Sequence, residues 1–228
     1  MFIEGTLVNI AAVTAGTLIG HFLGNRLSSR MRRTLMAGLG LAVALIGLQL
    51  ALQSTQLMIV IGGLILGGLA GEVIGVEDRL EKFGNRLQGR FANSGKVAEA
   101  FVTSSLLFCV GAMAIMGGLQ DGLDDTPTIL YAKSALDGIA SIALASTLGI
   151  GVLFSVIPLL VYQGGISVLA GQLQPILTAP VITEMNAVGG LLILAIAFDL
   201  LEIKRLPVGN LLPGIFVAAA LVWVCGLA

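Results

Sequence analysis

Two charged residues lie one helical turn apart inside an otherwise apolar stretch of the chain. In ILYAKSALDG, Lys133 and Asp137 are four residues apart, and Ser141 follows after four more. This spacing places all three on one helix face, and Ser134 lies beside the lysine. Ionisable groups within a membrane are costly and usually face a bundle interior or a water-filled cavity. A carboxylate in that position is suited to bind a cation or a proton, with the lysine adjusting the charge.

The same pair also has a purely structural interpretation. Lys133 can extend its ammonium toward the membrane surface while its apolar stem stays buried. The ion pair with Asp137 then fixes the register of its helix and binds nothing. The sequence leaves these two interpretations open, and Asp137 is the residue whose replacement separates them.

Polar residues in the two flanking apolar segments extend the candidate site. The preceding segment ends with Gln120 and Asp121, and the following one carries Ser155, Pro158 and Gln163. Proline lacks a backbone donor, so a helix break is predicted at Pro158, where the freed carbonyl needs a partner or a lined cavity. The predicted substrate- or ion-binding residues are Asp137, Lys133, Ser134, Ser141, Gln120, Asp121, Ser155 and Gln163.

The elements that must position these residues are membrane-spanning helices. Hydrophobic residues make up 57% of the 228 and charged residues 11%, with a mean hydropathy of +1.01. Soluble domains carry about 25% charged residues. The apolar runs approach the roughly 20 residues that span a bilayer and lack the alternation of barrel strands. The sequence predicts an all-α, polytopic transmembrane helix bundle of about eight spans in a single domain, 1–228. The predicted spans are 4–23, 34–53, 57–75, 98–118, 129–148, 152–172, 182–200 and 208–227.

The basic residues set the predicted orientation. All 12 Lys and Arg residues except Lys133 fall in the loops after the first, third and seventh spans. The positive-inside rule makes these loops cytoplasmic, so both termini lie outside. This parity requires two crossings between 129 and 172. A broken or re-entrant helix pair around 149–151 is the alternative.

Two further patterns concern membrane contacts. The loop 76–97 has apolar residues at helical spacing, which predicts either an amphipathic helix on the inner membrane surface or a solvated linker helix. Glycines also recur every four residues in the first and third spans. Such stripes let helices approach closely, within one protomer or between protomers, and a homo-oligomer is expected, with a dimer favoured. The two stripes are Gly16, Gly20 and Gly24, and Gly63, Gly67, Gly71 and Gly75.

The sequence lacks the signatures of the common enzyme classes. It has no HExxH motif, no phosphate-binding glycine loop and only one histidine, His21. Cys109 and Cys225 lie in apolar runs without metal-type spacing, which indicates buried small residues. The net charge of −1 does not suggest nucleic-acid binding. We therefore expect no enzymatic activity, no metal and no cofactor.

Several segments resemble a known family of membrane proteins. MGGLQDGL, LYAKSALDGIAS and GIGVLFSVIPLLVYQGG are similar to the YdfK/YqgA family of uncharacterised bacterial membrane proteins, a domain-of-unknown-function family, as are GTLVNIAAVTAGTLIG and EMNAVGGLLILAIAFDLLEIKRLPVGNLLPG. The resemblance covers nearly the whole chain. It implies a bacterial cytoplasmic membrane and one compact domain, and it assigns no activity. It implies that the family's characteristic segment includes Gln120, Asp121, Lys133, Ser134, Asp137, Gly138, Ser155, Pro158 and Gln163.

The polar face inside an apolar chain predicts a small transporter or channel-like permease for a cation or small solute, with proton or sodium coupling. The acidic outer loop, with Asp121, Asp124 and Asp125, would raise the local cation concentration. The alternative is a non-transporting membrane scaffold or accessory subunit, in which the glycines serve packing and the ion pair fixes helix register.

Overall fold

All the regular secondary structure in the described part of the chain is helical. The computed structural model describes residues 3–24, 26–79, 82, 97–123 and 127–227, and these contain no strand. Most of the predicted amphipathic segment 76–97 lies outside the described residues, as do Asp124 and Asp125. The longer helices are α1 (Glu4–Gly24), α2 (Ser29–Ala51), α3 (Leu57–Ile74), α5 (Val97–Cys109), α6 (Ala112–Leu123), α7 (Thr128–Leu148), α11 (Ala179–Leu200) and α13 (Pro213–Val224). The shorter ones are η1 (Ile150–Ser155), α8 (Val156–Leu159), η2 (Leu160–Gly164), α9 (Gly165–Val168), α10 (Ala170–Leu173) and α12 (Val208–Leu211).

The spanning helices confirm the predicted fold class. Among the described residues, six helices are long and apolar enough to cross a membrane. A seventh span results if α5 and α6 count as one, and a shorter apolar helix, Val208–Val224, covers the eighth predicted segment. The sequence thus places these helices correctly, and at most helix ends the predicted and observed bounds differ by only a few residues. The six are α1, α2, α3, α7, the run Ile150–Val168 and α11.

One bent helix pair occurs in this set, and it lies earlier in the chain than the sequence suggested. α5 and α6 bend by 61° at a break that contains Gly111, whose φ is 131°. Glycine tolerates that backbone conformation because it has no Cβ. At 149–151, Gly149 (φ 87°) instead connects two separate helices of spanning length. Their length and apolarity are compatible with the two crossings expected between 129 and 172.

The contacts divide the chain into two compact units. Unit 1 comprises Met1–Leu39 and Phe83–Pro175, and unit 2 comprises Gly40–Lys82 and Ile176–Ala228. Helix α2 passes from one to the other. Because each unit is described by itself, the single domain over 1–228 stays a prediction.

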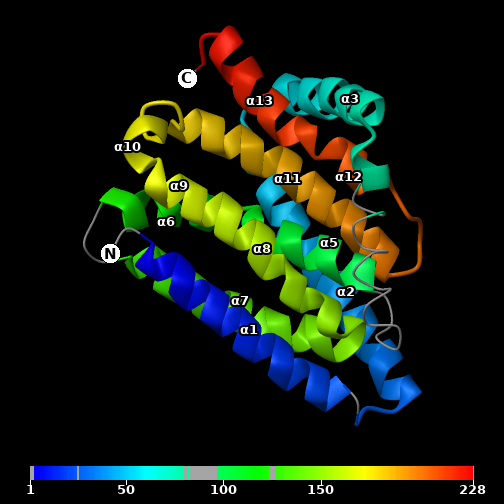
Figure 1. The fold of residues 1–228 in the computed structure, drawn as a ribbon. Coiled ribbons are helices and arrows are strands. Elements are labelled where there is room, and N and C mark those ends of the chain that lie inside the picture. The colour runs from blue at the N-terminus through cyan, green and yellow to red at the C-terminus, as the bar shows by residue number, and fades with distance from the viewer. Residues whose placement is uncertain (1–2, 25, 80–81, 83–96, 124–126, 228) are drawn as a thin grey trace. The chain divides into compact units, whose positions relative to one another are not determined.

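In unit 1, α1 packs against α7, and the two helices run in the same direction. Figure 1 shows them side by side. Three glycines of α1 lie directly on the α7 backbone, so that a Cβ at Gly24 would come within 2.5 Å of the Ser146 carbonyl oxygen. The absence of a side chain is what permits this approach. The facing residues are Gly16 with Gly138, Gly20 with Ile142, and Gly24 with Ser146.

The run Ile150–Val168 remains helical through Pro158, so the predicted helix break does not occur there. The hydrogen-bond spacing changes instead, from a 3-10 helix in η1 through one α turn in α8 to a π turn in η2. Proline removes one donor from the ladder, and a local change of helix type alters which carbonyls need a donor. The change also sets the direction in which Gln163, in the π turn, points its side chain.

In unit 2, α3 packs antiparallel on α12 and α13, again through glycines. Gly63 and Gly67 face Gly214, and Gly71 faces Asn210. Helices α2 and α11 approach in the same way, since a Cβ at Gly47 would lie 2.7 Å from the Gly190 carbonyl oxygen. Each unit therefore contains a glycine-rich helix in backbone contact with a neighbour.

Candidate functional site

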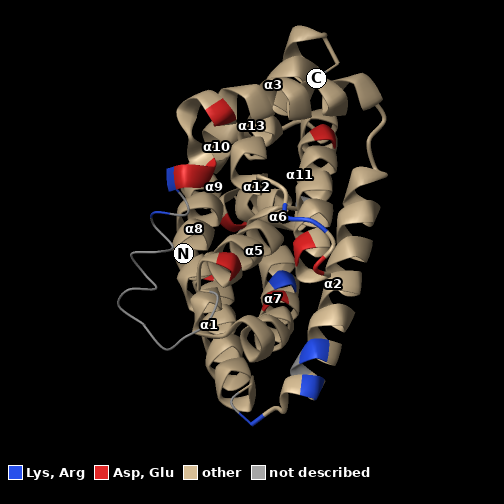
Figure 2. Cartoon of the chain, turned by 90° about the vertical axis from the view of Figure 1, so that its right-hand side faces the viewer, with Lys and Arg blue, Asp and Glu red and all other residues tan. Residues whose placement is uncertain are grey.

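The charged pair of α7 is buried at membrane depth. Lys133 Nζ donates to Asp137 Oδ2, and the two residues are 5% and 8% exposed. Asp137 is close to the midpoint of the 21-residue helix. At about 1.5 Å per residue it lies ~13 Å from the helix start, which is close to half the ~30 Å hydrocarbon thickness. In Figure 2, α7 carries both a blue and a red segment within its length.

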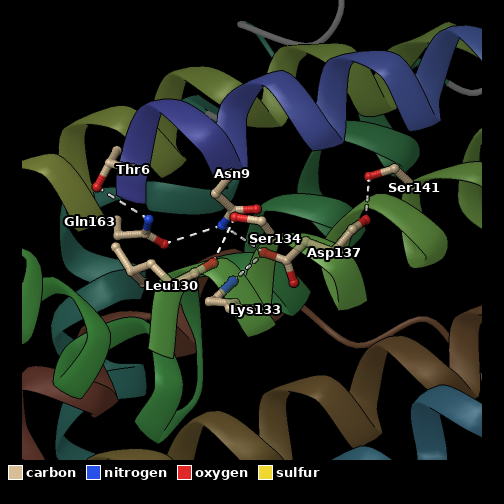
Figure 3. Close-up of polar contacts among 8 residues, drawn as sticks. All are labelled: Thr6, Asn9, Leu130, Lys133, Ser134, Asp137, Ser141 and Gln163. Carbon is tan, nitrogen blue, oxygen red and sulfur yellow. Dashed lines mark hydrogen bonds and ion pairs between the residues drawn. The ribbon is translucent and has the colours of Figure 1, made fainter. Parts of the chain in front are cut away.

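Helix α1 contributes an amide that joins this pair to the π turn. Asn9 Nδ2 donates to Asp137 Oδ2 at 2.9 Å and to Gln163 Oε1 at 3.3 Å. Gln163 Nε2 in turn donates to Thr6 Oγ1 at 3.2 Å. Figure 3 shows the Asn9 carboxamide between Gln163 and Asp137. Three segments that are distant in sequence thus meet through side-chain hydrogen bonds.

Asp121, at the end of α6, continues the connection and holds the start of α1. Its Oδ2 accepts from Thr6 Oγ1 at 3.2 Å and from Ser167 Oγ at 3.0 Å. The backbone N–H groups of Gly5 and Thr6 also donate to this carboxylate, at 2.9 and 3.3 Å. First-turn amides have no partner within their own helix, so an external acceptor is needed. We call the connected and buried set the buried polar chain: Lys133, Asp137, Asn9, Gln163, Thr6, Asp121 and Ser167.

Gln120 plays a similar part for α7. Its Oε1 accepts from Ile129 N at 3.0 Å and from Thr128 Oγ1 at 3.3 Å. Two adjacent side chains, Gln120 and Asp121, therefore hold the starts of the two parallel helices α7 and α1. Gln120 lies outside the buried polar chain.

Three of the predicted site residues bond to their own helices. Ser134 donates to Leu130 O at 2.6 Å, and Ser141 donates to Asp137 O at 2.7 Å. Ser155 donates to the Val152 carbonyl of η1 at 2.7 Å. This local bonding is common for hydroxyls inside helices and satisfies their donors without a partner element. Of the predicted residues, the structure brings together Lys133, Asp137, Gln163 and Asp121.

Sequence reasoning missed Thr6, Asn9 and Ser167 as site residues. Asn9 is a polar residue inside an apolar span, on the same buried side of α1 as the glycines. Ser167 follows Gln163 by four residues, which places both on one helix face. Extending the α1 glycine stripe by two turns and the stripe of Gln163 by one would have included Asn9 and Ser167.

One oxygen of the buried polar chain has no partner in the described part of the structure. Asn9 is 0% exposed, and its Oδ1 accepts no hydrogen bond there. Buried polar atoms are nearly always paired, so this acceptor is an exception in the side chain that also donates to Asp137. The described residues contain no group of three or more His, Cys, Asp or Glu that could hold a metal ion.

Unit 2 has a buried carboxylate of its own. Glu184 of α11 is 1% exposed and accepts from the backbone N–H groups of Thr55 and Gln56, at 3.0 and 3.2 Å. The hydroxyls of Ser54 and Thr55 also donate to it, at 2.6 and 3.3 Å. Glu184 holds the start of α3 as Asp121 holds the start of α1.

Comparisons with known proteins agree with this architecture. The family described as "Protein of unknown function (DUF554)" matches residues 4–223. The chain is 33% identical over 224 residues to "Uncharacterized membrane protein YdfK" of Bacillus subtilis (strain 168), with 96% of both chains covered. It is 33% identical over 223 residues to "Uncharacterized protein YqgA" of Escherichia coli (strain K12), with 95% of both covered. No solved structure matches. The resemblance read from the sequence is confirmed: this multi-pass membrane protein belongs to the DUF554 family of proteins of unknown function.

Proposed function

We propose that this protein is a small permease that moves a cation or a small solute across the bacterial inner membrane, with the buried polar chain as its binding site. The observation that carries the proposal is the set of hydrogen bonds that joins an ion pair at membrane depth to polar side chains of α1, α6, η2 and α9. Intramembrane ionisable residues of this kind commonly mark substrate or ion pathways.

Irregular helices in the same unit support the proposal. α5 and α6 form a bent pair, and η2 is a π turn that contributes Gln163. Discontinuous helices often form the binding sites of secondary transporters, and π turns are frequent at functional sites. We assign ion or solute binding to Asp137, with Lys133 as its counter-ion and Asn9 and Gln163 as neutral ligands. No catalytic role is proposed for any residue.

Flux through liposomes tests this function. The purified protein would be reconstituted and screened for movement of protons, alkali cations and amino acids. Asp137→Asn removes the buried charge and should abolish the flux that the wild type supports. Asp199→Asn makes the same chemical change at a half-buried position that does not belong to the buried polar chain, and it should leave the flux unchanged. The proposal fails if no solute moves faster than in empty liposomes, or if Asp137→Asn transports like the wild type.

A scaffold or accessory subunit is the second candidate. The observation in its favour is that Gln120 and Asp121 direct their oxygens at the first amides of α7 and α1, which is a structural use. In a scaffold, the Lys133–Asp137 pair would fix helix register in the same way. Absence of flux, together with a large loss of stability in Asp137→Asn, would favour this function.

The orientation remains a proposal based on the basic loops. Both termini would face the outside, so that the turn after α2 and the loop after α11 lie on opposite sides. Single cysteines at Gln53 and Lys204, in a Cys109→Ala, Cys225→Ala background, should react with a membrane-impermeant maleimide from opposite sides. Labelling of both positions from one side would overturn the proposed topology.

A homo-oligomer, with a dimer favoured, also remains a proposal. The glycines of α1 and α3 face α7, α12 and α13 within their own units, so a dimer would use other, lipid-facing surfaces. Native mass spectrometry of the detergent-solubilised protein measures the assembly directly. A purely monomeric mass would contradict the proposal.

A further inference from the structure

We infer that the Asp137 site takes a monovalent cation in exchange for a proton that leaves Lys133. This inference rests on the proposed function and specifies its substrate class. It follows from three properties of the buried polar chain: its free oxygen atoms, its charge balance and the chemistry of lysine.

Asp137 and the two amide side chains linked to it supply oxygens of the kind that suits a small cation. Both hydrogen bonds to its carboxylate end on Oδ2, one from Asn9 and one from Lys133. Asn9 Oδ1 is buried and has no partner among the described residues. Gln163 Oε1 lies within hydrogen-bond distance of the same Asn9 amide. Carboxylate and amide oxygens are the ligands that hard cations prefer.

The charge balance requires an exchange. The ion pair of Lys133 and Asp137 is neutral, so an added cation would leave an uncompensated positive charge in a buried site. Such charges are strongly disfavoured in a membrane interior. If the Lys133 ammonium releases its proton to solvent, the cation replaces it as the counter-ion of Asp137. The step balances: one cation enters, one proton leaves, and the lysine remains as a neutral amine.

Lysine suits this step, because a buried lysine changes its protonation readily whereas arginine does not. A divalent cation does not fit the same balance, since one carboxylate and one released proton leave an excess positive charge. An anion would meet the Asp137 carboxylate directly. The site is therefore specific for a singly charged cation.

The titratable groups around the pair do not offer a second counter-charge. Cys109, at the end of α5, interacts electrostatically with both Lys133 and Asp137. Asp121 of α6 already accepts two backbone amides and two hydroxyls. Among the other neighbouring elements, η2 contributes Tyr162 and η1 has no titratable side chain. Glu4, at the exposed start of α1, accepts from the Tyr131 hydroxyl at 2.8 Å.

Binding measurements on the purified full-length protein test the exchange without transport. Sodium, lithium or potassium chloride would be added to weakly buffered protein in detergent, with choline chloride matching the ionic strength. A pH indicator reports released protons, and calorimetry reports affinity. We expect up to one proton per bound alkali cation, and an affinity that rises with pH toward about tenfold per unit, as one-proton linkage requires. A wild-type affinity that does not change with pH overturns the inference.

Two substitutions of the lysine separate proton exchange from a structural ion pair. Lys133→Arg keeps the positive charge but cannot release a proton, so cation binding and proton release should both be lost. Lys133→Gln leaves Asp137 without a competing charge, and a nearby opposite charge shifts a carboxylate's affinity for protons about 10- to 1000-fold. By the same field, the sodium affinity of Lys133→Gln should rise about tenfold or more at a pH where Asp137 is ionised, and any proton released on binding would then come from Asp137 and not from position 133. Wild-type affinity in Lys133→Arg would overturn the inference.

The possible failures are distinguishable. Flux of another solute that depends on Asp137, without proton release on adding alkali cations, removes this inference and leaves the proposed permease. Flux that does not depend on Asp137 removes the proposed function itself. The wild-type pH dependence needs no variant, so a variant that fails to fold does not prevent a decision.

Discussion

Replacing Asp121 with alanine should loosen the start of α1 more than any other single change at that end of unit 1. The carboxylate accepts two backbone N–H groups, from Gly5 and Thr6, and two hydroxyls. Ser167 keeps a second acceptor after the substitution, the Gln163 carbonyl at 3.0 Å, and Thr6 Oγ1 still accepts from Gln163. The two backbone amides therefore lose their acceptor, and the Thr6 hydroxyl loses the acceptor of its own proton.

The size of the effect follows from those amides. A buried donor left without a partner costs about 1–3 kcal/mol, so two donors amount to about 2–6 kcal/mol of unfolding free energy. Asp121→Asn keeps one acceptor oxygen and turns an N–H₂ group toward a donor. We expect it to lose about 1–3 kcal/mol, between the wild type and Asp121→Ala.

Hydrogen exchange followed by mass spectrometry measures this locally. Peptides from the start of α1 should exchange faster in Asp121→Ala, because a loss of ~2 kcal/mol is roughly a 30-fold change in an opening equilibrium. Peptides from α11, in unit 2, serve as an internal reference, and Asp199→Ala as the matched variant. Wild-type exchange at the start of α1 in Asp121→Ala would refute the assigned capping role.

Three further predictions concern packing and charge. Glu184→Ala should destabilise the start of α3 by a similar amount, about 2–6 kcal/mol for two uncapped amides, read from exchange of α3 peptides; unchanged exchange would contradict it. Gly20→Ala places a Cβ against the α7 backbone and should cost about 1–3 kcal/mol in thermal or denaturant unfolding, whereas Gly38→Ala, with nothing within 4 Å, should cost nothing. Lys133→Gln and Asp137→Asn each leave one charged partner buried and unpaired, so each should lower the free energy of unfolding by about 3–5 kcal/mol. The double variant should be more stable than either single variant. Additive losses would mean that the two side chains are not coupled.

The fold could be predicted from the sequence because membrane spans follow from local composition. Hydropathy alone places α1, α3 and α7 to within one or two residues of their observed ends. The distribution of basic residues then required separate crossings on either side of Gly149, and the structure has a helix of spanning length and apolarity on each side of it. The bend at Gly111 escaped prediction, since a glycine inside an apolar run marks a packing position as often as a break.

The candidate site was only partly predictable, because helical periodicity identifies a face but not the neighbour that it meets. Lys133 and Asp137 were found from their spacing within one helix. Asn9 reaches them from a position 128 residues earlier in the chain, and Gln163 is 154 residues from Asn9. Asp121 was selected for its charge, whereas its geometry is that of a helix cap. The demand of first-turn amides for acceptors is a three-dimensional requirement that composition does not reveal.

The parallel packing of α1 on α7 has an electrical consequence. In an antiparallel pair the helix macrodipoles oppose one another, whereas in a parallel pair they add. Each helix places roughly half a positive charge at its start and half a negative charge at its end, so the pair approaches one unit of each. Asp121 stands at the positive end of this dipole, and Asp137 lies midway along it. Along the axis from Glu4 toward Gly24, this helix pair therefore favours positive charge near the Gly24 end and negative charge near the Glu4 end.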